Sequence, residues 1–151
     1  MNRRPESVLV VVHSDDSQVL LLRRVTPFDF WQSVTGSLQH GESPANAAIR
    51  ELFEETGLRN QGRLTDTQTA RIFTIDPRWR HRFSPGVTEN REHEWRYRLP
   101  APCDVRLNAA EHCESRWLPI DDAIATVWSW TNREALESLR SELPSRQSGS
   151  E

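Results

Sequence analysis

Hydrophobic and polar residues alternate in several short segments of the chain, a pattern typical of strands with one buried face. Segments 7–13 and 18–24 are rich in β-branched residues and leucine, and the polar stretch between them predicts a hairpin. Segment 92–99 alternates throughout and places His93, Trp95, Tyr97 and Leu99 on one face. Shorter strands are expected at 31–35 and 115–118, and 63–75 is expected to hold two strand segments.

A different periodicity predicts one helix in the first half of the chain, from Pro44 to Thr56. An apolar stripe recurs at helical spacing, and Ser43 and Gly57 have the chemistry of an N-cap and a left-handed C-cap. The stripe consists of Ala45, Ala48, Ile49, Leu52 and Thr56. Two further helices are expected near the end of the chain, from Pro119 to about 127 and, capped by Asn132, from Arg133 to about 143.

This order of elements predicts an α+β fold, a mixed β-sheet sandwiched between helices in α/β/α layers. The 151 residues are expected to form a single domain over 1–143, and the polar segment 144–151 is expected to be a disordered tail. Hydrophobic content is only 36%, so we expect the six tryptophans to supply bulky core material.

Charge and composition narrow the possible partners. A net charge of −3 argues against a general nucleic-acid-binding protein. The longest apolar runs, 8–12 and 19–22, are too short to cross a membrane, and the first residues lack the apolar stretch of a signal peptide. Two cysteines without a CxxC pattern suit a reducing compartment. We therefore expect a cytoplasmic protein with no membrane association, whose oligomeric state the sequence leaves open.

The expected helix 44–56 carries an acidic cluster. Glu51, Glu54 and Glu55 lie at i, i+3 and i+4, so their carboxylates share one side of the helix, with Arg50 beside Glu54. Like charges at this spacing repel each other by a few tenths of a kcal/mol (about 0.2–0.5) per pair. Binding of a divalent cation removes that cost, and Mg²⁺ prefers oxygen ligands. The pattern predicts a hard-metal site, with Mn²⁺ as an alternative ion.

The segment from Gly36 to Leu58 resembles the Nudix box. Gly36, Glu42 and the stretch Arg50-Glu51-Leu52-Phe53-Glu54-Glu55-Thr56-Gly57-Leu58 match its pattern. The resemblance implies Mg²⁺-dependent hydrolysis of a diphosphate linkage. It assigns Glu51 and Glu55 as main metal ligands, Glu54 as ligand or general base, and Arg50 as the residue that holds a glutamate in place. Which glutamate is the base stays open.

Three segments outside the box are similar to the bacterial dihydroneopterin triphosphate diphosphatases, a group within that family. They are 30–37, 81–88 with Glu94-Trp95, and 128–133 with Ala135. The resemblance implies release of pyrophosphate from a pterin triphosphate in folate biosynthesis, with side activity on dATP. The expected partner is thus a small-molecule pterin or nucleoside triphosphate. Alternatives are another Nudix substrate such as a dinucleoside polyphosphate or ADP-ribose, a non-catalytic binding module, and an RNA 5′-end-processing enzyme.

The same resemblance implies substrate contacts and one more metal ligand. It indicates Arg24, Thr35 and Ser129 as substrate-binding residues and, more weakly, Arg3 and the stretch 73–76 that begins with Phe73. It also indicates that Glu111, from a loop ahead of strand 115–118, completes the metal site.

Several residues keep two readings. The basic stretch 78–82 could contact phosphate or lie in a solvated loop, and Trp31, Trp128 and Trp130 could belong to the core or to a pocket. The single histidines, His112 among them, have no metal-ligand spacing and are expected to be structural or solvated.

Overall fold

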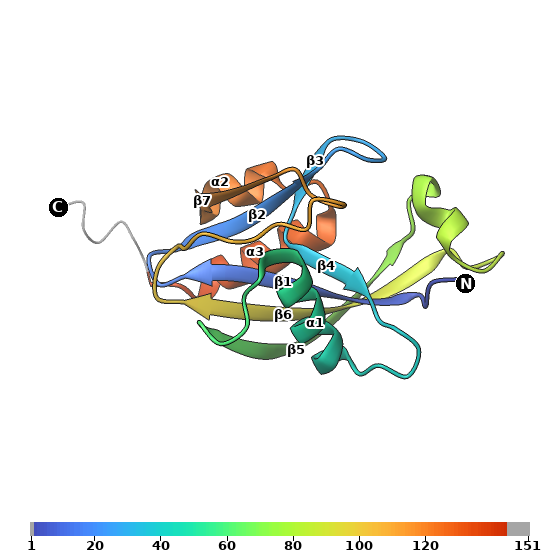
Figure 1. Ribbon diagram of the computed structural model, residues 1–151, viewed down its shortest axis with the longest axis horizontal. Coiled ribbons are helices and arrows are strands. Elements are labelled where there is room, and N and C mark those ends of the chain that lie inside the picture. Colours follow the sequence, from blue (N-terminus) through green and yellow to red (C-terminus); the bar gives the residue numbers. More distant parts are fainter. Residues whose placement is uncertain (1, 145–151) are drawn as a thin grey trace.

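Seven strands form one mixed β-sheet in this computed structural model, which describes residues 2–144 (Figure 1). Strand order is β3-β2-β1-β6-β5, with β4 also paired to β1 and β7 to β2. Among the strand pairs of residues 2–144, β1–β6 alone is parallel. The strands are β1 Glu6–Ser14, β2 Gln18–Arg24, β3 Phe30–Gln32, β4 Val34–Ser37, β5 Arg63–Thr74, β6 Glu89–Leu99 and β7 Glu114–Pro119.

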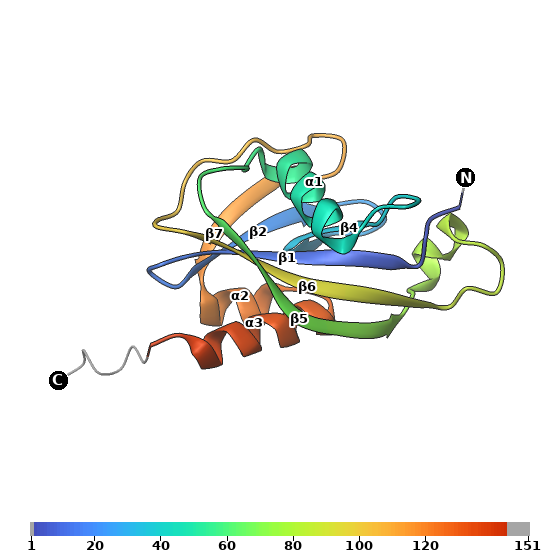
Figure 2. The same cartoon turned by 90° about the horizontal axis from the view of Figure 1, so that it is seen from below.

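Helices cover both faces of this sheet, as the sequence predicts (Figure 2). Helix α1 (Pro44–Thr56) lies on one face, and α2 (Ile120–Thr126) and α3 (Trp130–Glu142) lie on the other. A short 3₁₀ helix, η1 (Pro77–Arg82), joins β5 to β6. Within residues 2–144, no helix is long and apolar enough to cross a membrane.

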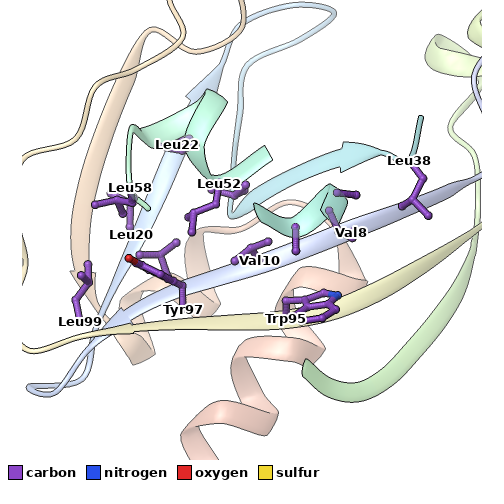
Figure 3. Packing of buried hydrophobic residues seen from close by; sticks show 14 residues of the cluster. Val8, Val10, Leu20, Leu22, Leu38, Leu52, Leu58, Trp95, Tyr97 and Leu99 are labelled. Atoms are coloured by element: carbon purple, nitrogen blue, oxygen red, sulfur yellow. The ribbon is translucent and has the colours of Figure 1, made fainter. Parts of the chain in front are cut away.

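Strand β1 lies in the middle of the sheet, and both of its faces are buried. This burial explains its near-continuous run of valine and leucine. Val8, Val10 and Val12 pack under α1 together with Trp95, Tyr97 and Leu99 of β6 (Figure 3). Leu9 and Val11 face the opposite way and pack against Leu136 and other residues of α2 and α3. The two faces of β1 thus belong to two separate apolar clusters. The alternation predicted for 92–99 is confirmed.

Two of the predicted strand segments differ in detail from the strands in the structure. The segment 31–35 is divided into β3 and β4 at Ser33, whose backbone N–H donates to Asn132 Oδ1 (2.8 Å) instead of to a neighbouring strand. The two segments expected in 63–75 are one strand, β5, with an irregular register between Asp66 and Thr69. Gln68, at the irregularity, has a φ of 60°.

The start of the last helix was predicted wrongly. Helix α3 begins at Trp130, and its N-cap is Ser129, whose Oγ accepts from the Asn132 backbone N–H (3.1 Å). Asn132 lies in the first turn, where its buried side chain hydrogen-bonds to Ser33. The sequence favoured Asn132 because asparagine is a good cap, and only the contact with a distant strand shows its other role.

Helix α1 has the predicted bounds, N-cap and left-handed C-cap, but its buried face is rotated from the predicted stripe. Ala45 is exposed and Ile49 is 49% exposed, whereas Ala47, Glu51 and Glu55 are buried. Glu51 and Glu55 therefore lie on the face of α1 that packs on the sheet, whereas Glu54 is exposed.

The tryptophans contribute less to the core than expected. Trp95 is buried, and Trp31 and Trp117 pack at the edges of the two clusters. Trp128 and Trp130 are 42% and 49% exposed. The predicted tail lies outside the described residues apart from Pro144.

Candidate active site

A cavity of about 700 Å³ opens over one end of the sheet, next to the start of α3. Its floor is the sheet face that also carries Leu9, and the strand registers align the residues of this floor in rows across β4, β1, β6 and β5. One such row is Ser37, Ser7, Glu92 and Arg71, of which the first three line the cavity.

One glutamate of the acidic cluster on α1 lines this cavity. It is Glu51, which is only 8% exposed; Glu55, one turn further along α1, is 1% exposed. A β-carbon at Gly36 would overlap with the Glu51 carboxylate. Glycine at the first box position therefore gives this carboxylate the space to lie against β4.

A second acidic element joins them from a distant loop. Ligand atoms of Glu55, Glu111 and His112 all lie within 4.8 Å of one another. His112 Nδ1 is 2.7 Å from Glu55 Oε1, but neither atom forms a hydrogen bond with any described residue. The structure thus brings Glu111 to the box helix. It also places His112, which the sequence did not connect with a metal, beside a predicted ligand.

This donor set fits a divalent cation. Burial raises the pKa of Glu51 to about 7; Arg50 opposes the shift, and the negative charges of Glu55 and Glu54 add to it. Carboxylates packed this closely in a buried place need a compensating positive charge. Carboxylate oxygens are the ligands that hard divalent cations prefer. Glu51, Glu55 and Glu111 remain the predicted ligands, and the structure groups ligand atoms of the last two with His112.

Arg50 organises the acidic side chains. Its guanidinium donates to both carboxylate oxygens of Glu42 (2.8 and 2.9 Å), to the Ser37 carbonyl (3.0 Å) and to Glu51 Oε2 (3.0 Å). A weaker bond reaches Glu54 Oε1 (3.3 Å). Because these bonds use the whole planar fork of the guanidinium, Arg50 is a positioning residue. Glu54 has a side chain that is 48% exposed.

Three arginines gather near the acidic residues. Arg3, Arg24 and Arg82 all line the cavity. Burial lowers the pKa of Arg82, the positive charges of Arg3 and Arg24 lower it further, and Glu111 opposes the shift. Arg24 Nη1 is 3.6 Å from Glu111 Oε1, and the Arg3 backbone N–H donates to the Arg82 carbonyl (2.6 Å). Like charges gathered in this way favour binding of a polyanion.

The arginines of the basic stretch 78–82 have different surroundings. Arg82 lines the cavity, whereas Arg78 pairs with Asp76 (2.9 Å) and lies over the Phe28 ring. The sequence indicated this stretch but gave no means to tell its arginines apart, because their directions depend on the 3₁₀ turn of η1.

Aromatic rings form a wall of the cavity. The rings of Phe30, Trp79 and Trp128 lie with centroids 5.5–5.8 Å apart, and all three residues line the cavity. They come from β3, η1 and the segment before α3. The pocket reading of Trp128 thus fits its position, and Trp79 is a residue that sequence reasoning did not single out.

The remaining predicted substrate residues also line the cavity. Thr35 Oγ1 donates to the Val8 carbonyl (2.9 Å) and keeps its lone pairs for a further bond. Ser129 caps α3, and its Oγ lies 3.3 Å from Thr131 Oγ1. Phe73 lies on β5 opposite Asn90.

Comparison with known proteins agrees with this arrangement. The dihydroneopterin triphosphate diphosphatase of Escherichia coli K12 is 42% identical over 141 residues, covering 91% of this chain and 93% of that protein. The enzyme of the same name from Haemophilus influenzae is 36% identical over 140 residues, covering 87% and 85%. The structure of the E. coli dihydroneopterin triphosphate pyrophosphohydrolase superposes with a TM-score of 0.85 at 40% identity, covering 91% and 96%. The NUDIX domain family matches residues 3–139, and the chain belongs to that family.

Proposed function

We propose that this protein is a Mg²⁺-dependent pyrophosphohydrolase that converts dihydroneopterin triphosphate to dihydroneopterin monophosphate and pyrophosphate. The observation that carries the proposal is the lining of the cavity. Glu51 and three arginines line it together with an aromatic wall. A ligand with a flat ring and a polyphosphate chain matches both kinds of lining. The names of the relatives that share most of this chain's length point to the same substrate.

Each group of residues has a distinct task in this proposal. Arg3, Arg24 and Arg82 bind the phosphate chain, and guanidinium groups suit phosphate oxygens because they can donate two parallel bonds. Phe30, Trp79 and Trp128 hold the ring and exclude water from it. Arg50 fixes the directions of Glu42, Glu51 and Glu54. Mg²⁺ bound by Glu51, Glu55 and Glu111 would neutralise phosphate charge and lower the pKa of a bound water.

The reaction cuts the bridge between the α- and β-phosphates. The oxygen of water bonds to phosphorus, the bridging P–O bond breaks, and the electron pair leaves with the departing phosphate group. A box carboxylate accepts the proton, and Glu54 is the candidate because Arg50 holds it at the partly exposed edge of the cluster. Anchoring at both ends places one phosphorus in line with the water.

The proposal is tested by measuring turnover under Mg²⁺ of dihydroneopterin triphosphate and dATP by pyrophosphate release, and of ADP-ribose by formation of AMP. The pterin triphosphate should have the highest kcat/KM, with pyrophosphate as primary product. Mass spectrometry of both products formed in ¹⁸O-enriched water identifies the phosphorus that is attacked. Orthophosphate as the primary product, or a preference of about tenfold for dATP, would instead indicate a general nucleotide hydrolase.

A further inference from the structure

Two glutamates on the same face of β6 differ in their surroundings. Glu94 is 2% exposed and is held by Arg71 (2.7 Å) and Arg96 (3.6 Å). Glu92, two residues earlier, is 7% exposed and lines the cavity, and no described residue forms an ion pair with it. Arg71 lies opposite Glu92 in the strand register, but its guanidinium is directed to Glu94 and Glu134.

A buried carboxylate without an ion pair destabilises the ligand-free protein when it is ionised. Burial raises the pKa of Glu92 to about 7; the Thr131 hydroxyl on α3 and the Arg71 charge on β5 oppose the shift, and Glu94 adds to it. The neighbouring residue on β1, Ser7, is uncharged and accepts from Asn90 Nδ2 (2.8 Å). The charge of Glu92 is therefore compensated only in part by the protein, and a ligand with hydrogen-bond donors would satisfy it.

The position of Glu92 excludes a phosphate group as that ligand. A carboxylate repels phosphate, and the arginines near Glu111 offer the polyanion a better place. The floor around Glu92 is thus suited to the other end of the substrate, where the ring lies. A ring edge that presents two adjacent N–H donors can form two parallel bonds to one carboxylate.

We propose that Glu92 selects the ring of the substrate by accepting both N–H donors of a 2-amino-4-oxopyrimidine edge. This inference rests on the proposed function and adds the residue that sets its ring specificity. Pterin and guanine share that edge. Adenine presents one donor beside one ring-nitrogen acceptor, and the lone pair of that acceptor faces the ionised carboxylate unfavourably.

The substitution Glu92→Gln gives the sharpest test because glutamine keeps the size of the side chain and reverses the match. Its amide offers one donor and one acceptor, which complements adenine. We expect kcat/KM for dihydroneopterin triphosphate and for dGTP to fall about tenfold or more relative to dATP. Glu89→Gln is the matched control, because it makes the same change at an exposed position of the same strand; it should leave both ratios unchanged.

A second measurement needs no variant. Only ionised Glu92 accepts two bonds, so the ratio of dGTP to dATP turnover in the wild-type enzyme should rise between about pH 6 and about pH 8.5. A ratio of two substrates cancels titration of the metal site, which both substrates share. In Glu92→Gln the ratio should not change with pH.

The outcomes separate this inference from the proposed function. Failure of the wild-type protein to hydrolyse dihydroneopterin triphosphate would refute the proposed substrate, while the dGTP-to-dATP ratio would still test Glu92. Ratios in Glu92→Gln within about twofold of wild type, or a wild-type ratio independent of pH, would overturn the role of Glu92.

Discussion

The metal side and the ring side of the cavity are built in different ways. On the metal side, one helix and the turn before it supply most of the functional residues, and Glu42, Arg50, Glu51, Glu54 and Glu55 lie within 14 positions of each other. On the ring side, the wall and floor come from β3, η1, β6 and the start of α3. The chain therefore encodes most of its acidic cluster locally and its ring pocket through tertiary contacts.

This difference agrees with what each side has to do. Ligands of one ion must be held within a few ångströms of each other, and a helix keeps residues at i and i+4, such as Glu51 and Glu55, close together. Only Glu111 has to be brought to them by the fold. A flat ring needs a larger surface, and no single element is wide enough to provide it. The contrast leads to four predictions.

Removal of the divalent ion should have the largest effect. We expect no measurable turnover in EDTA and full recovery when Mg²⁺ is added, because the bare carboxylates would repel the substrate phosphates. The pyrophosphate-release assay measures this. Undiminished turnover in metal-free buffer would show that the acidic cluster is not a catalytic metal site.

Substitution of single ligands comes next. Glu55→Gln and Glu51→Gln should each lower kcat by about 10²-fold or more, since a lost charge weakens both ion binding and activation of water. Glu137→Gln, at an exposed position of α3, is the control. Circular dichroism must show folded proteins, because both ligands lie on the buried face of α1. Wild-type turnover in a folded Glu55→Gln protein would contradict the assignment.

On the ring side, the difference in stability between Glu92→Gln and wild type should depend on pH. The folded-state pKa of Glu92 is about 7 and its ordinary value is 4.5, so between these values the folded protein keeps a proton that the unfolded chain has released. Wild-type stability is therefore lost as pH rises through this window. Relative to wild type, Glu92→Gln should gain up to about 3 kcal/mol between pH 4.5 and pH 7. Urea unfolding at both pH values measures this gain; an equal difference at the two would refute it.

The smallest effect is expected at the start of α3. Ser129→Ala removes the N-cap and should cost about 1 kcal/mol of stability. It should also lower kcat/KM for the pterin triphosphate more than for dATP, if the hydroxyl bonds to the ring edge. Ser129→Thr keeps a hydroxyl cap and should restore the stability. Equal losses for both substrates would limit Ser129 to a structural role.

The sequence by itself determined the α+β fold, the bounds and caps of α1, and the contiguous set of acidic residues. It could do so because periodicity, capping and i, i+4 spacing act between near neighbours in the chain. Arg24, Thr35, Ser129 and Glu111 could be indicated only by resemblance to a family, since no local pattern connects them.

Tertiary structure decided the rest. The registers of β4, β1 and β6 bring Ser37, Ser7 and Glu92 into one row, and the contact of Asn132 with Ser33 moves the start of α3 to Trp130. The 3₁₀ turn of η1 directs Arg82 and Trp79 into the cavity and leaves Arg78 on Asp76. Glu92 and Glu94 are chemically identical, and the alternating pattern of the strand places both on the same face. The positions of Arg71 and Arg96 distinguish the paired carboxylate from the one that faces the substrate cavity.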